Sequence, residues 1–467
     1  MADSNNTSGN RVAFATVTSL FFMWGFISCM NDLLIPKFKA EFDLSQFQAN
    51  LVQFFFFGAY FLVSLTYFLI SAAKGDPINK IGYKNGLIIG LILTGGACLV
   101  FYPAANAQSY PLFLTALCLL GSGVTLIQIA ANPYISILGP EKSASSRLNL
   151  SQGLNSLGYV LTPLIGGYFL FKGSDDAGLD SVKAPYIGLA IILFAIAAAI
   201  KLTKLPTFRQ EGKVEAGIKV FRHKHFVWGW WAIFFYVGAE VTVGSILVNY
   251  LGDKEIAGLS EEEGVKYLSF YWGGLMIGRL VGAISLSSLA EAKKFPMMIV
   301  AALISIIVIF ISAKGDSDLT VGEIWPYFVT VVLSFIFFKL GNALPGRMVG
   351  LFALVATVLS ILAMTTSGEF ALWSIVGIGL FNSIMWSNIF TLSIRGLGDD
   401  TSQGSSLLVM MIVGGAILPL IQGFMMDSMG VRLSLAIVLV SYLYLAFFGF
   451  IGSKIGRKDD TTTAPTA

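Results

Sequence analysis

Charge, histidine and cysteine are scarce in this sequence, and each scarcity excludes a class of protein. Only 12% of the 467 residues are charged, while 55% are hydrophobic; a soluble domain carries about 25% charged residues. The only two histidines, His223 and His225, share one basic segment, so a histidine-based metalloenzyme has no ligand set. The three cysteines stand apart inside apolar runs, without metal or redox spacing. The net charge of +3 is too small to indicate nucleic-acid binding.

Long apolar runs are abundant instead. About 20 helical residues cross the hydrocarbon core of a bilayer. Runs of that length fall near 13–35, 49–72, 86–104, 110–138, 150–172, 184–202, 226–250, 267–288, 296–313, 324–341, 347–365, 371–394, 405–425 and 431–452. The sequence therefore predicts an all-α polytopic membrane protein with about 14 transmembrane helices.

The basic residues predict the sidedness of the chain. If the N-terminus is cytoplasmic, most of the 30 Lys and Arg residues fall in cytoplasmic loops and ends, and the 201–225 segment is the richest of these. Acidic loops such as Glu261 to Glu263 then face outward. By the positive-inside rule, both termini are expected in the cytoplasm.

The two parts of the chain that flank 201–225 share short motifs in the same order. The run Gly123 to Asn132 resembles Gly379 to Asn388, and Ser151-Gln-Gly resembles Ser402-Gln-Gly. Internal repeats of this kind are common in transporters. We expect an N-terminal six-helix bundle (1–200), a cytoplasmic basic linker (201–225), a C-terminal bundle (226–453) and a cytoplasmic tail (454–467). The apolar pair at about 290–342 has no counterpart in the first half, which predicts an inserted two-helix hairpin.

Amides in helical register interrupt the apolar sequence between positions 120 and 158. Gln128 and Asn132 are four residues apart, and Gln152 and Asn155 are three apart, so each pair lies on one helix face. Such groups are costly in lipid and are expected to face a protein interior or a cavity. The stretch predicts a polar binding site at membrane depth.

Several motifs resemble a known family. They are Asn31-Asp-Leu-Leu-Ile-Pro36, Ala130-Ala-Asn-Pro-Tyr134, Arg147-Leu-Asn-Leu-Ser-Gln152, Asn155-Ser-Leu-Gly158 and Tyr236-Val-Gly-Ala-Glu240. The chain resembles the fucose–proton symporter family of the major facilitator superfamily, and most of all its glucose/galactose branch. The resemblance covers most of the chain and implies two six-helix bundles around a central sugar site that opens alternately to each side.

Two positions depart from the family's pattern. Where the fucose members carry an acidic residue that takes part in proton-linked sugar binding, this chain has Gln128, which cannot titrate. In the loop after the second apolar run, Asn79 stands before Lys80 where the superfamily usually has an acid.

Asp32 and Glu240 are carboxylates well inside apolar runs, and such groups are functional candidates because they are costly to bury unpaired. Asp32 matches the family's coupling aspartate; the alternative is a solvated helix end. Oxygen ligands suit Na⁺, so we expect Asp32, Asn31, Thr125 and Gln128 to bind the coupling cation, with Na⁺ favoured over H⁺ and Asp32 as its metal ligand. Glu240 either binds the cation or the sugar, or forms a structural hydrogen bond between helices.

Sugar hydroxyls donate and accept hydrogen bonds, so amides, carboxylates and flat aromatic faces suit a sugar site. The predicted substrate-binding residues are Gln128, Asn132, Gln152, Asn155, Glu240, Asn249, Trp272, Asn382, Trp386 and Asn388. Interhelix hydrogen bonding is the alternative for each amide, and packing is the alternative for Tyr236 and the two tryptophans. Arg279 is expected to close a cytoplasmic gate by bonding to carbonyls or an acid, or else to reach the interface; Pro133 is expected to let its helix bend.

The sequence thus predicts a cation-coupled monosaccharide symporter, not an enzyme, that imports a glucose- or galactose-like hexose without a cofactor other than the co-transported Na⁺ or H⁺. Its expected partners are the sugar, the cation and the lipid bilayer, and it is expected to act as a monomer in a bacterial inner membrane. The alternatives are a facilitative uniporter, a drug–proton antiporter and a non-transporting sugar sensor on the same scaffold.

Overall fold

A computed structural model describes residues 7–44, 46–172, 178–203, 205–206, 217–314 and 319–456. Within these ranges the protein is helical and has no strand. Residues 204 and 207–216 of the predicted linker, and the predicted tail beyond Gly456, lie outside the described residues. The first helices are α1 (Thr7–Glu41), α2 (Gln46–Lys74), α3 (Pro77–Ile81), α4 (Tyr83–Asn106), α5 (Tyr110–Ile137), α6 (Ala144–Gly167) and α7 (Lys183–Leu202).

The helices after the linker are α8 (Lys224–Gly252), α9 (Glu261–Ser285), α10 (Glu291–Lys314), α11 (Trp325–Gly341), α12 (Pro345–Thr365), α13 (Gly368–Asn382), α14 (Met385–Ile394), α15 (Thr401–Met410), α16 (Gly414–Ser434) and α17 (Ala436–Phe450). Local sequence explains where several of these helices begin. Proline, whose missing N–H costs nothing in the first turn, opens α3, α5, α11 and α12. A capping box starts α9, in which Ser260 and Glu263 each accept the other's backbone N–H.

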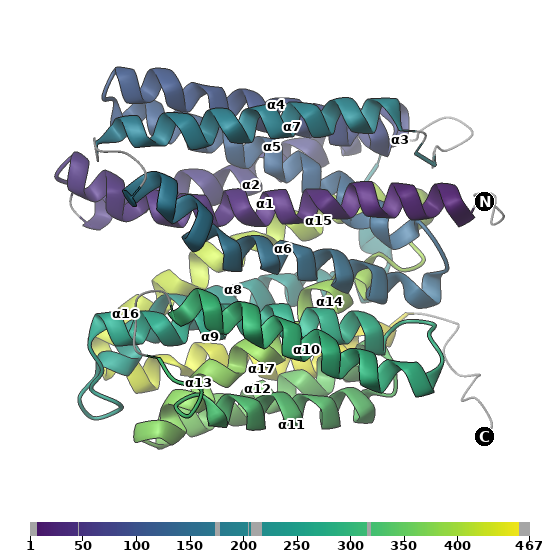
Figure 1. Cartoon of the computed structure of the whole chain (residues 1–467). Coiled ribbons are helices and arrows are strands. Elements are labelled where there is room, and N and C mark those ends of the chain that lie inside the picture. The colour runs from purple at the N-terminus through teal and green to yellow at the C-terminus, as the bar shows by residue number, and fades with distance from the viewer. Residues whose placement is uncertain are drawn as a thin grey trace, which may run out of the picture.

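Helix packing repeats between the two halves of the chain. Helix α1 packs on α6 as α8 packs on α16, and α4 packs on α5 and α7 as α12 packs on α13 and α17. The halves meet where α6 contacts α9 and where α2 contacts α15. Figure 1 shows α1, α4, α5 and α7 on one side, α9 to α13 on the other, and α6 and α8 between them. This order of contacts agrees with the internal repeat of the sequence, while the domain boundaries stay predictions.

Helices α10 and α11 occupy the segment predicted as an inserted pair. Helix α10 packs on α9, and α11 contacts α12 and α13, at the lower side of the view in Figure 1. Apolar side chains of α10 such as Leu303, Ile307 and Ile311 are exposed on the protein surface. Helix α11 has 17 residues and is therefore about 26 Å long, slightly less than the hydrocarbon core.

Eleven helical segments of the described chain are long and apolar enough to cross a membrane. This number shows a multi-pass membrane protein, while the predicted count of about 14 helices stays a prediction. Helices α6 and α9 are not among the 11. Both carry polar side chains, with Asn149, Gln152 and Asn155 on α6 and Arg279 on α9, and polar groups lower the apolar character of a helix that faces other protein.

Two runs that were predicted as continuous helices are interrupted. The run 371–394 breaks after Asn382 and resumes at Met385, and the run 405–425 contains a 3₁₀ turn at Met411–Val413. Hydropathy does not report such breaks, because the residues on both sides are equally apolar. The first break has a consequence for the site, since it leaves the carbonyl of Ser383 available to a side chain.

Candidate functional site

A cavity of about 150 Å³ lies between the two halves. Both halves contribute to its wall, from α1, α2, α5, α6, α8, α9, α14 and the turn before α16. The lining residues are Trp24, Ser28, Phe57, Tyr60, Gln128, Gln152, Asn155, Ser156, Tyr159, Tyr236, Val237, Glu240, Val241, Trp272, Leu275, Arg279, Trp386 and Ile412. A volume of this size holds on the order of ten water-sized groups, which suits a small polar molecule.

One carboxylate and one guanidinium stand in this wall. Oε1 of Glu240 on α8 lies 3.7 Å from Nη2 of Arg279 on α9, and the two residues are only 9% and 6% exposed. The separation exceeds that of a charge-assisted hydrogen bond. The pair therefore attracts electrostatically and still leaves Glu240 able to accept a hydrogen bond from a ligand.

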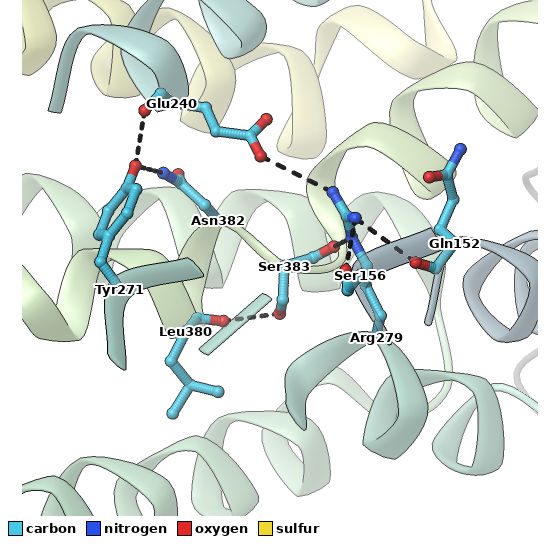
Figure 2. Close-up of polar contacts among 8 residues, drawn as sticks. All are labelled: Gln152, Ser156, Glu240, Tyr271, Arg279, Leu380, Asn382 and Ser383. Atoms are coloured by element: carbon cyan, nitrogen blue, oxygen red, sulfur yellow. Dashed lines mark hydrogen bonds and ion pairs between the residues drawn. The ribbon is translucent and has the colours of Figure 1, made fainter. Parts of the chain in front are cut away.

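Arg279 also joins the two halves (Figure 2). Its Nη1 donates to Ser156 Oγ at 2.7 Å and to Gln152 O at 3.4 Å on α6, and its Nε donates to Ser383 O at 3.2 Å. The Ser383 carbonyl is available because the helix is interrupted there. Gly278 permits the approach, since a Cβ at that position would lie 1.9 Å from Ser383 Oγ. Arg279 thus has the carbonyl and carboxylate partners expected from sequence, while its role as a gate stays a prediction.

Three of the predicted amides line the cavity. Gln128 Nε2 on α5 donates to Tyr60 OH on α2 at 3.0 Å, and Asn155 Nδ2 on α6 donates to Phe21 O on α1 at 3.0 Å. Gln152 is also in the wall and gives its backbone carbonyl to Arg279. Each of these amides retains an oxygen that can accept from a hydroxyl.

Aromatic side chains also line the cavity. Tyr159 on α6 and Trp272 on α9 stack across the two halves with ring centroids 6.2 Å apart and an interplanar angle of 21°. Tyr236 and Trp386, whose centroids are 6.5 Å apart, stand in the wall as well. The flat surfaces expected for a sugar site are therefore present.

The other predicted substrate residues lie outside the cavity wall. Asn249 is exposed near the end of α8, and Asn132 is fully buried in α5 with no hydrogen-bond partner for either amide atom among the described residues. Asn382 donates to Tyr271 OH at 3.2 Å, and that hydroxyl donates to Glu240 O (Figure 2). Asn388 is buried and bonded to Asn149. Pro133 is buried within α5.

The predicted cation ligands do not form hydrogen bonds with one another within the described chain. Asp32 is exposed on α1, and its Oδ1 accepts from the amide of Gln53 on α2. Thr125 donates to Gly121 O on its own helix, Gln128 donates to Tyr60, and both amide atoms of the buried Asn31 lack partners. No group of three or more His, Cys, Asp or Glu residues that could hold a metal ion occurs in the described residues.

Sequence reasoning missed several lining residues. Trp24, Ser28, Phe57, Tyr60 and Tyr159 belong to apolar runs in which nothing distinguishes them from packing residues. A pattern of helix faces could have selected Tyr159, which lies seven residues, or about two helical turns, after Gln152. The others depend on how α1 and α2 are rotated in the bundle.

At one end of the bundle, hydrogen bonds close the gap between the halves. This end, here called the basic end, is where α2 ends at Lys74 and α4 begins beside Lys84. There Gln403 Nε2 donates to Ser71 Oγ at 3.0 Å, and Ser405 Oγ donates to Ile129 O at 3.0 Å. The cavity is therefore separated from the basic end by contacts between the halves.

Comparison with known proteins agrees with this architecture. The family model of the Major Facilitator Superfamily matches residues 12–338. The chain is 38% identical over 449 residues to the glucose/galactose transporter of Brucella abortus, covering 95% of this chain and 94% of that one. It is 35% identical over 463 residues to the putative glucose/galactose transporter of Helicobacter pylori, covering 96% and 98%.

A solved structure is also similar. FucP, the fucose–proton symporter of Escherichia coli, superimposes in its outward conformation with a TM-score of 0.74 and 27% identity, covering 94% of this chain and 98% of that one.

The chain is therefore a member of the major facilitator superfamily, a class of membrane transporters, and not an enzyme. Within the superfamily it belongs to the fucose–proton symporter family, on the branch of the glucose/galactose transporters. The family resemblance noted in the sequence is confirmed, and the protein is a sugar transporter.

Proposed function

We propose that this protein imports a glucose- or galactose-like hexose together with a cation by alternating access. The cavity between the halves is the observation that carries the proposal, because it combines amides, one carboxylate and flat aromatic faces. Sugar hydroxyls would donate to Glu240 and exchange hydrogen bonds with Gln128, Gln152 and Asn155, while Trp272 and Trp386 would cover the apolar ring faces. The glucose/galactose transporters among the relatives support a hexose.

The proton is the proposed coupling ion, and Asp32 is its proposed carrier. A single carboxylate with one amide donor, Gln53, can gain and lose one proton. Sodium would require several oxygen ligands, and no hydrogen bond within the described residues links Asp32 to Thr125 or Gln128, which donate to Gly121 O and Tyr60 OH instead. The sodium preference expected from sequence is not supported by the comparisons, in which a similar protein is a fucose–proton symporter.

The contacts between the halves support alternating access. The basic end, which we assign to the cytoplasm together with both termini, is closed by bonds between the halves. Once the coupling carboxylate is neutral and the sugar fills the cavity, the loaded halves would close at the outer side, where Tyr159 and Trp272 already stack, and open at the basic end. We propose that the transporter does this as a monomer in a bacterial inner membrane.

Uptake of radiolabelled glucose, galactose and fucose into proteoliposomes tests the proposal. Wild-type protein should accumulate glucose or galactose under an inward proton gradient, and Asp32→Asn should abolish accumulation while sugar exchange at equal concentrations persists. Asp253→Asn, which removes a carboxylate that caps Glu255 N in a loop, is the matched control and should accumulate sugar normally. Accumulation driven only by sodium would overturn the proton assignment. Equal uptake without any gradient would identify a uniporter.

A further inference from the structure

Three contacts join α6 and the short turn before it to α14 and the residue after it, between the cavity and the basic end, and they are spaced by about one helical turn. The residues on the α6 side are four apart and those on the α14 side are three or four apart, so the helical members of each set share one face. The pairs, here called the α6–α14 ladder, are Asn149 Nδ2 to Asn388 Oδ1 at 3.1 Å, the hydroxyls of Ser145 and Thr391 at 2.6 Å, and the ion pair of Glu141 with Arg395. Each pair takes one residue from each half of the protein.

The amide pair of the ladder lies directly beneath the cavity. Asn149 precedes Gln152 by about one turn on α6, and Asn388 follows Trp386 on α14. Gln152 and Trp386 are in the cavity wall. The pair therefore lies between residues of the cavity wall and the basic end along both helices.

These two amides are incompletely bonded. Both residues are fully buried, yet Asn149 Oδ1 and Asn388 Nδ2 have no hydrogen-bond partner among the described residues. One is an acceptor and the other a donor, and they belong to amides that already touch. A hydroxyl group both donates and accepts, so a single sugar hydroxyl has the chemistry to satisfy both atoms.

The other two pairs of the ladder become more exposed toward the protein surface. Ser145 and Thr391 are buried hydroxyls, whereas the side chains of Glu141 and Arg395 are 62% and 38% exposed. An exposed ion pair is weak. If the halves separate at the basic end, the exposed ion pair of Glu141 and Arg395 therefore breaks first. The bond between Asn149 and Asn388 breaks last.

We propose that Asn149 and Asn388 form a second sugar site, which binds a neutral hexose as it leaves the cavity toward the basic end. This inference rests on the proposed function, because it requires that the protein transports a sugar through that end. In this proposal Asn388 binds the sugar while the sugar is released, whereas the sequence predicted that it binds the sugar in the central site. The two amides exchange their bond with each other for bonds to sugar hydroxyls.

Half-saturation concentrations measured from each side of the membrane test the site. Radiolabelled galactose influx gives the external value and galactose efflux gives the internal value, for wild type, Asn149→Ala and Asn388→Ala. Thr391→Val is the matched control, because it breaks the next pair of the ladder at nearly constant volume and leaves both side-chain amides in place. The hydroxyl that it removes also bonds the backbone carbonyls of Ser387 and Asn388. The internal value should rise about three- to tenfold in each Asn variant, as expected for one lost hydrogen bond, while the external value stays within about twofold.

A ladder that only holds the halves together predicts the opposite pattern. Breaking any of its bonds would then favour the state open at the basic end, so the internal value would fall and the external value would rise in the Asn variants and in Thr391→Val alike. That outcome, or an unchanged internal value, overturns the second site. Quenching of tryptophan fluorescence by external galactose verifies that each variant is folded, and Asn149→Ser replaces an Ala variant that is not. Absence of transport by the wild type would contradict the proposed function, independently of the variants.

Discussion

Replacing Arg279 by glutamine should destabilise the protein through the carboxylate that it leaves behind. At the 3.7 Å separation of Glu240 Oε1 and Arg279 Nη2, the attraction of two unit charges is about 4.5 kcal/mol for an effective dielectric constant of 20. Removing one member of a buried pair typically costs about 3–5 kcal/mol, because the other charge stays unpaired. Glu240→Gln should lower the free energy of unfolding less, by on the order of 1–3 kcal/mol, because Arg279 keeps three neutral acceptors.

The double variant measures the interaction energy between the two charges apart from their other contacts. Glu240→Gln with Arg279→Gln removes both charges, so its loss of stability should be smaller than the sum of the two single losses by about 2 kcal/mol or more. Thermal unfolding in detergent, followed by tryptophan fluorescence, measures this, and each kcal/mol should correspond to roughly 1 °C for a chain of this length.

Arg147→Gln is the matched control for this cycle. Arg147 donates to the carbonyls of Ile135 and Ser136 and pairs with no carboxylate in the described residues. The loss of stability caused by Arg147→Gln should therefore be the same with and without Glu240→Gln. If the losses of Glu240→Gln and Arg279→Gln simply add, the two charges are not energetically coupled and the reasoning fails.

Two further substitutions test the cavity and the helix packing around it. Gln128→Ala removes the amide that bonds Tyr60 in the cavity wall and should raise the half-saturation concentration for external sugar about tenfold, as measured by influx; an unchanged value would show that this amide does not bind sugar. Gly278→Ala should cost about 1–3 kcal/mol of stability, because its Cβ would lie 1.9 Å from Ser383 Oγ, whereas Gly423→Ala, which meets nothing within 4 Å, should not destabilise. Equal melting temperatures for the two alanine variants would contradict the close approach of α9 to Ser383.

The sequence alone determined the class of protein and most of its helices. Runs of apolar residues must satisfy their backbone groups internally in lipid, so they can only be helices. For this reason the predicted runs 110–138 and 184–202 agree closely with α5 and α7. The ordered family motifs determined the superfamily and the branch. Amides at helical spacing in an apolar segment also indicated Gln128, Gln152 and Asn155, because polar groups in such a segment need a protein or aqueous environment.

Tertiary structure decided which polar residues share the cavity. Asn388 and Trp386 are two residues apart in the sequence, yet only Trp386 reaches the cavity wall, while Asn388 faces Asn149 of the other half. Helical spacing fixes which residues lie on one face, but it does not fix the direction in which that face points. That direction depends on side-chain packing between distant helices, as does the break after Asn382 that presents the Ser383 carbonyl to Arg279. Apolar pattern carries no information about either feature, so only the packed bundle determines them.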